Sequence, residues 1–257
     1  PVDPSCSTST ITLETGSIVV TRNSLTVNGP GMDKLTIASD LAAPVRALRS
    51  FEHDGDGVST SGTLSISNLS LRTGFVYSST ASVAGGCIYS KENVSLTNVR
   101  ISDCIAHVRG ANYAEGGGIA VVHDLKLRGS VISGNGAVGL TAGSGASVAI
   151  GGGVAVGGDL YAFKSTISGN YANGPTSTSS IGEAGGFYAH GGANIRYSVV
   201  SGNTAGKGIG GFFVNGGYEA KFTDSTISGN SAPYGVIGGG AISNTSNVYF
   251  YNSTLAF

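Results

Sequence analysis

The sequence predicts an all-β, single-domain fold: a right-handed parallel β-helix with three short strands per coil and variable loops on one side. Three observations predict it. Glycine supplies 43 of the 257 residues, more than twice an average share of about 7%, and glycines inside helices are costly. Two short motifs recur at a fixed separation. Between them, apolar and polar residues alternate with the period of a strand.

The two motifs mark successive coils. A glycine pair or triplet followed by an apolar residue comes first, and a segment that ends in Ser-Gly-Asn in four of five repeats comes second. The distance between their apolar residues is 13 in four repeats and 15 in the fifth, whereas the rest of each repeat varies from 12 to 22 residues. A constant segment alternating with a variable one indicates a solenoid whose insertions leave from one side. The apolar pairs are Ile88/Ile101, Ile119/Ile132, Val154/Ile167, Phe187/Val200 and Phe212/Ile227.

Within the constant segment the apolar residues define three strands. In one repeat they are Ile119 and Val121, then Leu125 and Leu127, then Ile132, and equivalent positions are apolar in the other repeats. We expect each strand to pair in parallel with its equivalent one coil later, about 4.8 Å away, through right-handed crossovers. One coil cannot bury its apolar side alone, so stacking supplies the stability.

An asparagine ends the second motif in four repeats. Stacked at a turn, each side-chain amide would donate to the asparagine carbonyl of the next coil, which satisfies polar groups that would otherwise be buried without partners. The preceding glycine supplies the positive φ of the bend. We therefore predict a structural ladder of Asn135, Asn170, Asn203 and Asn230.

Composition excludes several classes. With 14 basic and 15 acidic residues, the chain lacks the basic balance of a nucleic-acid-binding protein. No apolar run reaches the 18 or more residues of a membrane helix, so membrane contact is expected only through an anchor outside this sequence. Cys6, Cys87 and Cys104 lack metal-type spacing. They form either one disulfide and a leftover thiol or three small buried side chains.

The ends of a solenoid need caps. We expect residues 1–22 to cover the N-terminal mouth and residues 23–257 to form the β-helix. Val248, Phe250 and Leu255 fit a further coil, but no Ser-Gly-Asn follows them. We expect more coils or an anchor beyond this point, and end-to-end self-association through an open strand edge.

The paired motifs, Gly-Gly-small-aliphatic and aliphatic-x-x-Asn, resemble the repeats of polymorphic outer-membrane proteins and related autotransporter passengers. They also resemble bacterial secreted β-helix proteins of the pectate-lyase-like superfamily. The resemblance covers about residues 85–257, and residues 24–31 resemble the opening coils of those secreted proteins. This sequence departs from the outer-membrane family in the second motif. It has an aliphatic residue before x-x-Asn, where that family favours Phe. The resemblance implies a β-helix that serves as an adhesin, a passenger domain or a polysaccharide enzyme.

One outward column of the strand after the glycines contains aromatic and small residues. Tyr89, Tyr188 and Phe213 share this column with two alanines and a serine. Rings beside small residues would form a shallow trough that stacks against sugar rings. In the alternative interpretation, the variable loops fold over this face and the aromatic rings pack beneath them.

Candidate catalytic groups cluster beside this trough. Glu115 and Glu183 both stand four residues before the first inward residue of their strand, two coils apart. Their backbones would be roughly 9 to 10 Å apart, near the upper carboxyl separation of inverting glycosidases. His190 and Arg196 share the coil of Glu183. The alternative is a chance coincidence of charges in variable loops.

We expect no metal or cofactor, apart from a candidate Ca²⁺ site at one acidic segment. Residues 52–57 are the densest acidic segment and would be the place for Ca²⁺, but they lack the remainder of an EF-hand loop. A solvated turn is the alternative. Asp124 and Asp159 occupy equivalent turns, but Gly192 stands at that place in the next coil, so a third ligand is missing.

Two functions from different classes remain. The preferred one is a secreted or bacterial outer-surface module with a structural or adhesive role, which binds carbohydrate or a host or cell-surface ligand on the aromatic face. The alternative is a polysaccharide hydrolase or lyase that uses Glu115, Glu183, His190 and Arg196.

Overall fold

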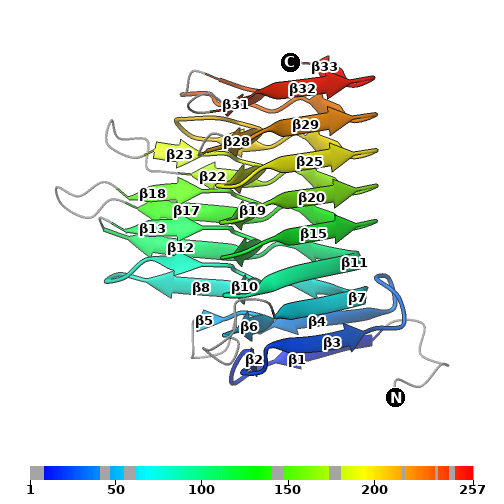
Figure 1. The fold of residues 1–257 in the computed structure, drawn as a ribbon. Coiled ribbons are helices and arrows are strands. Elements are labelled where there is room, and N and C mark those ends of the chain that lie inside the picture. The colour runs from blue at the N-terminus through cyan, green and yellow to red at the C-terminus, as the bar shows by residue number, and fades with distance from the viewer. Residues whose placement is uncertain are drawn as a thin grey trace.

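The structure, a computed structural model, describes residues 9–40, 47–54, 62–110, 112–140, 147–173, 181–215, 218–234, 237–242 and 247–256. This part of the chain is all-β and forms a parallel solenoid of about six turns. Figure 1 shows the coils stacked on one another from the N-terminal end to the C-terminal end. Among the described residues, no helix has the length and apolarity needed to cross a membrane.

Sheet B contains the strand that follows the glycine motif. Each strand has three residues, and from β6 to β28 the first and third of them are buried. Parallel pairing connects Ile88, Ile119, Val154, Phe187 and Phe212 in one row. The strands are β2 (Ile18–Val20), β6 (Phe51–His53), β10 (Ile88–Ser90), β14 (Ile119–Val121), β19 (Val154–Val156), β24 (Phe187–Ala189), β28 (Phe212–Val214) and β31 (Gly240–Ile242).

Sheet A has two arms, which β7 (Thr63–Arg72) and β11 (Asn93–Ser102) span without interruption. Later coils divide into two shorter strands. The first arm contains β3 (Ser24–Asn28), β15 (Leu125–Arg128), β20 (Leu160–Phe163), β25 (Ala193–Arg196), β29 (Ala220–Thr223) and β32 (Val248–Tyr251). The second contains β1 (Ser9–Leu13), β4 (Leu35–Ser39), β16 (Val131–Ser133), β21 (Thr166–Ser168), β26 (Val199–Ser201), β30 (Thr226–Ser228) and β33 (Thr254–Ala256).

The register confirms the predicted vertical row. Ile101, Ile132, Ile167, Val200 and Ile227 pair in succession along the second arm. The described part of the predicted N-terminal cap joins the same sheets, because β1 pairs with β4 and β2 pairs with β6, both in parallel.

The variable half of the repeat also forms strands, in sheets C and D. Middle coils therefore have five strands where we predicted three, because short alanine- and glycine-rich segments gave no clear strand pattern. Sheet C contains β5 (Ala47–Leu48), β8 (Phe75–Ser78), β12 (Ile105–Arg109), β17 (Gly136–Leu140), β22 (Tyr171–Asn173) and β27 (Thr204–Ala205). Sheet D contains β9 (Val83–Ala84), β13 (Tyr113–Glu115), β18 (Val148–Ile150) and β23 (Ile181–Glu183).

Sheets C and D form a separate layer beside the main coil, which we call the fin. Its core consists mainly of alanines, among them Ala106, Ala114, Ala137 and Ala149, and it is distinct from the large aliphatic core enclosed by sheets A and B. The length differences between middle repeats lie between the sheet C and sheet D strands. In Figure 1 the fin extends to the left of the main stack.

The glycine motif forms a waist between the two cores. A Cβ on Gly117 would overlap the backbone of Gly136, and one on Gly152 would overlap the backbone of Tyr171. The segment that leads into sheet B therefore packs directly on the segment that follows sheet A. Their backbones are so close that only glycine fits between them.

Asparagines line this waist as a hydrogen-bonded ladder. The Asn135 Nδ2 donates to Asn170 Oδ1 at 2.9 Å, Asn170 to Asn203 at 3.0 Å, and Asn203 to Asn230 at 2.9 Å. Each amide also donates to a main-chain carbonyl, for example Asn170 Nδ2 to Ile132 O at 3.0 Å. The glycines before them have positive φ values of 58 to 67°. The ladder predicted from the sequence is thus confirmed, and its buried amides find partners within the stack.

A second ladder, which the sequence analysis did not predict, begins the same motif. The Ser165 amide donates to Ser198 Oγ at 3.0 Å, and the Ser198 amide donates to Ser225 Oγ at 3.2 Å. These buried hydroxyls sit at the bend between the two arms of sheet A, where the preceding residues Lys164, Tyr197 and Asp224 adopt positive φ.

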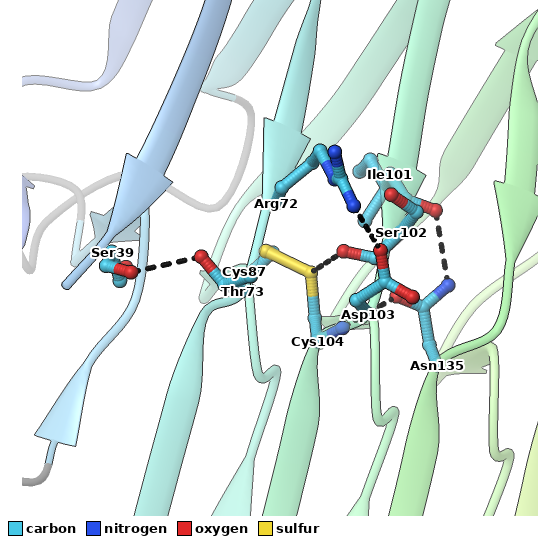
Figure 2. A network of polar contacts seen from close by, with 9 residues as sticks. All are labelled: Ser39, Arg72, Thr73, Cys87, Ile101, Ser102, Asp103, Cys104 and Asn135. Carbon is cyan, nitrogen blue, oxygen red and sulfur yellow. Dashed lines mark hydrogen bonds and ion pairs between the residues drawn. A yellow bond between two sulfur atoms is a disulfide. The ribbon is translucent and has the colours of Figure 1, made fainter. Parts of the chain in front are cut away.

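Cys87 and Cys104 form a disulfide with a Cα–Cα distance of 5.5 Å. Of the two interpretations of the cysteines, the disulfide is therefore the one confirmed; Cys6 lies outside the described residues. Figure 2 shows the disulfide next to the ladder, where the Cys104 amide donates to Asn135 Oδ1 at 3.0 Å.

Candidate functional site

A groove of about 300 Å³ lies where the fin meets sheet B. It crosses four successive coils and brings together four residues that we selected from the sequence. We call it the Tyr89–Tyr188 groove. The residues that line it are Ala84, Tyr89, Glu115, Ala120, Val121, Val122, Ile150, Ala155, Val156, Gly157, Tyr188 and His190.

Sheet B sets the floor and the two ends of the groove. The central outward residues pair in the order Tyr89, Ala120, Ala155, Tyr188. Two alanines therefore separate the tyrosines, which are three coils, or roughly 14 Å, apart along the solenoid axis. Because alanine side chains are short, the floor is recessed between the rings.

Tyr89 is held by a basic side chain against its ring. The Arg49 guanidinium lies 5.2 Å from the ring centroid. Arg49 is itself fixed by an ion pair with Glu52 at 2.6 Å and by hydrogen bonds to the carbonyls of Ala84 and Gly85 at 3.1 and 3.2 Å. The cation–π contact and this network restrict the ring before any ligand arrives.

Tyr188 is held from the following coil. The Asn215 Nδ2 donates to its hydroxyl at 2.9 Å, and the Phe213 ring lies 5.7 Å away, tilted by 60°. Phe213 therefore supports Tyr188 from behind and is not among the residues that line the groove. An aromatic ring with its own side-chain contacts thus stands at each end of the groove.

Glu115 supplies the carboxyl group of the groove. It is the last residue of β13 and is partly buried, and this burial raises the pKa of the Glu115 carboxyl. No ion-pair partner for it lies within the described part of the chain. His190 follows β24 and is exposed at the rim. The groove thus combines ring faces with one carboxyl that holds its proton more tightly than usual and one imidazole.

Glu183 shares the column of Glu115 but lies outside the groove. In sheet D, Glu115 pairs with Ile150, and Ile150 pairs with Glu183. The two backbones are therefore two coils apart, roughly 9 to 10 Å, with an apolar residue between them. Burial also raises the pKa of the Glu183 carboxyl.

Arg196 is not part of this arrangement. It shares a coil with His190, but it belongs to β25 and lines a groove on the outer face of sheet A. The two residues are close along the chain, which predicted a shared site, but the turn between β24 and β25 directs them to different faces.

Among the described residues, no group of three or more His, Cys, Asp or Glu side chains could hold a metal ion. Within the acidic segment, Glu52 pairs with Arg49, and Asp54 pairs with Lys91 at 2.9 Å. Residues 55–57 lie outside the described residues.

The two turn aspartates have structural partners. Asp124 Oδ1 accepts from the Asp159 amide at 2.9 Å, and Asp159 Oδ1 accepts from the Gly192 amide at 2.7 Å. Each carboxylate thus satisfies the backbone of the next coil. Gly192 completes the row as a donor at the position where a third metal ligand would be needed.

Sequence reasoning missed Arg49 and Asn215, the two residues that hold the tyrosines. Arg49 precedes the first clear repeat, so no motif placed it beside Tyr89. Asn215 stands in the one constant segment that is two residues longer than the others, which obscured its alignment. The register of sheet B places the strands next to these residues beside the tyrosines, since β6 pairs with β10 and β28 pairs with β24.

Comparisons with protein-family models, with curated proteins and with solved structures found no match to this chain.

Proposed function

We propose that this chain is a secreted or cell-surface β-helix module with a structural or adhesive role, and that it binds carbohydrate in the Tyr89–Tyr188 groove. The observation that carries the proposal is the pair of fixed tyrosine rings at the two ends of a floor made of two alanines. The resemblance of the paired motifs to autotransporter passengers and to pectate-lyase-like β-helix proteins supports a display or carbohydrate-related role.

This arrangement suits a sugar chain. The C–H faces of pyranose rings are apolar and pack on aromatic rings, while their hydroxyl groups need polar partners at the edges. Glu115 and His190 supply such partners beside the floor. The volume of about 300 Å³ is at the lower end for small-ligand sites. Because the two tyrosines are roughly 14 Å apart, a ligand that contacts both of them must be a segment of a longer sugar chain.

The disulfide supports the location outside the cytosol. Disulfides persist in oxidising compartments such as the periplasm and the cell exterior, and they are rare in the cytosol. The buried Cys87–Cys104 bridge therefore favours a secreted or surface-displayed protein. A stacked solenoid also presents an extended surface, which suits a module with a structural or adhesive role.

Binding to a panel of neutral and acidic oligosaccharides, followed by calorimetry on those that bind, tests the proposal. We expect Tyr89→Ala and Tyr188→Ala each to weaken binding by roughly tenfold, because each removes one stacking surface. Tyr113→Ala is the matched control, since Tyr113 is an exposed sheet D tyrosine that does not line the groove. If no oligosaccharide bound, or if all three variants bound like the wild type, the proposal would be wrong.

A second candidate function is glycoside hydrolysis or polysaccharide cleavage. One observation favours it: burial raises the pKa of both Glu115 and Glu183, which stand in one column two coils apart. A carboxyl with a raised pKa is suited to donate a proton to a leaving oxygen. Release of reducing ends from the same oligosaccharides, abolished in both Glu115→Gln and Glu183→Gln, would support it. Binding without release would favour the module.

A further inference from the structure

A second groove, of about 510 Å³, lies on the outer face of the first arm of sheet A. It is formed by β11, β15, β20 and β25 and shares no lining residue with the Tyr89–Tyr188 groove. We call it the basic groove. The residues that matter here are Lys126, Arg128, Tyr161, Phe163, Asn194 and Arg196.

Among the described residues, every charged side chain that lines the basic groove is a cation. Lys126, Arg128 and Arg196 are exposed, and no ion pair joins them to any residue that the structure describes. Some other cations of the chain are neutralised: Arg72 pairs with Asp103 at 2.9 Å, and Arg100 pairs with Asp33 at 2.7 Å. In a chain whose formal net charge is −1, this face concentrates positive charge that lacks an ion-pair partner within the described ranges.

The nearest acidic groups are already engaged. Asp124 and Asp159 precede the strands and accept backbone amides of the next coil. Asp159 also accepts from the Tyr161 hydroxyl at 2.8 Å, which is the main reason that the pKa of Tyr161 is raised to about 12. Tyr161 therefore stays neutral and adds no negative charge to the groove. Lys221 and Glu219, on the coil after Arg196, pair with each other at 2.6 Å.

Aromatic rings support the cations. The Arg128 guanidinium lies 5.1 Å from the centroid of Phe163, and the Lys164 ammonium lies 5.4 Å from the same ring. The Lys126 ammonium lies 5.9 Å from the ring of Tyr161. Such contacts hold the stems against the sheet and leave the charged ends toward solvent.

The register aligns the two arginines along the solenoid axis. Arg128 pairs with Phe163, and Phe163 pairs with Arg196, so one ring separates the two arginines. Their backbones are two coils apart, roughly 9 to 10 Å. Lys126 and Asn194 occupy the neighbouring outward column, on either side of Tyr161. The groove thus presents anion-binding groups in a row with ring faces between them.

We propose that the basic groove binds a linear anionic glycan, whose sulfate or carboxylate groups pair with Arg128 and Arg196 and whose sugar rings lie against the exposed ring of Tyr161. The guanidinium fork pairs with planar or tetrahedral oxyanions through two parallel hydrogen bonds. A glycan is favoured over a nucleic acid because only three cations line the groove and the chain has a formal net charge of −1, whereas nucleic-acid-binding domains carry an excess of basic residues. The disulfide favours an oxidising compartment outside the cytosol, where glycans are common polyanions. The proposal stands independently of the other groove, because the two share no residue.

Calorimetry tests the proposal with four probes: a sulfated heparin oligosaccharide, an oligogalacturonate, a neutral dextran oligosaccharide and a single-stranded oligonucleotide of similar length. The test variant is Arg128→Gln/Arg196→Gln. The control is Arg72→Gln/Arg100→Gln, which removes the same charge from arginines that are ion-paired on the second arm. Circular dichroism and the thermal midpoint confirm that both variants fold.

We expect the sulfated probe, the galacturonate probe or both to bind, and the neutral dextran not to bind in the basic groove. The test variant should weaken binding by at least about tenfold, because it removes charge-assisted contacts, and the control should change it less than about threefold. The relative affinity of the two anionic probes identifies sulfate or carboxylate as the preferred group. Absence of binding by both, equal loss in both variants, or tighter binding of the oligonucleotide would overturn the proposal.

Discussion

Cys87 and Cys104 occupy the two positions that a glycine and an asparagine take in each of the next four coils. Cys87 aligns with Gly118, and Cys104 donates its amide to Asn135. In the later coils, a Cβ on the equivalent glycine would lie about 3 Å from the ladder asparagine, for example 2.8 Å from the Asn170 Cγ for Gly153. Where the ladder begins, a covalent bond therefore closes the waist in place of the glycine–asparagine contact.

This equivalence predicts that a glycine and an asparagine can take the place of the two cysteines. Cys87→Ala/Cys104→Ala should lower the free energy of unfolding by about 3 kcal/mol, as expected for a bridge that closes a loop of this length. Cys87→Gly/Cys104→Asn should lose less, because the introduced side-chain amide would donate to Asn135 Oδ1 as the later asparagines donate along the ladder. Urea denaturation of both variants measures the difference. An equal loss in the two would mean that the coil of Cys87 and Cys104 cannot accommodate the ladder.

Asn170→Ala should remove the centre of the asparagine ladder. Its Oδ1 accepts from the Asn135 amide at 3.0 Å and from the Asn135 Nδ2 at 2.9 Å, so the variant deprives two buried donors of this acceptor. We expect a loss of about 2 to 4 kcal/mol in the free energy of unfolding. Asn173→Ala, at the exposed end of β22, is the control and should change it by less than about 0.5 kcal/mol. Similar values for the two variants would contradict a stabilising role for the ladder.

Gly152→Ala should disrupt the waist. The new Cβ would overlap the backbone of Tyr171 and the carbonyl oxygen of Gly185, so the two chain segments would have to separate. We expect a loss at the upper end of the range of about 1 to 3 kcal/mol for overpacking. Gly16→Ala is the matched control, since nothing lies within 4 Å of a Cβ there. Chemical denaturation should give a lower midpoint for Gly152→Ala than for Gly16→Ala. Equal midpoints would rule out close contact at the waist.

The two partly buried glutamates should make stability depend on pH. Because burial raises their folded-state pKa values above the usual 4.5, the folded chain binds more protons than the unfolded chain between those values. The stability that the two glutamates contribute is therefore fully present below about pH 4.5. It is lost as the pH rises through their raised pKa values in the folded chain. Glu115→Gln/Glu183→Gln should gain stability relative to wild type over this range. Urea midpoints from about pH 3.5 to about pH 8 measure the gain.

Glu14→Gln, a change at an exposed residue, is the control for that experiment. Its stability should follow the wild-type curve at each pH. A constant offset between the double variant and wild type at all pH values would show that the two carboxyls do not titrate differently in the folded chain.

The sequence predicted the main coil well because its signal is repeated. Ile132, Ile167, Val200 and Ile227 recur at one place in a constant segment, so a single alignment fixes their row. The asparagine ladder follows from the same alignment. The fin was missed because its core residues, such as Ala106 and Ala137, are too small to stand out from the surrounding glycine and serine.

The candidate groove was only partly predictable. The spacing of Tyr89 and Tyr188 placed both rings in one outward column. The sequence also placed Glu115 beside this column, where the structure has it. It did not show that Glu183 would lie outside the groove, or that the turn before β25 would direct Arg196 to another face. Those outcomes depend on how the variable half of each coil folds back, which no repeated residue encodes.

The separation of the two cores gives this chain a place to change length at little cost. Within the described residues, the aliphatic core and the alanine core lie on either side of the glycine waist, so residues added after Leu140, where β17 ends on the fin side, leave the aliphatic stack and its ladders in register. A foreign peptide grafted there would be displayed on a scaffold whose aliphatic core does not depend on the sequence of that peptide. The same property explains how neighbouring coils of one chain tolerate segments of such different sizes.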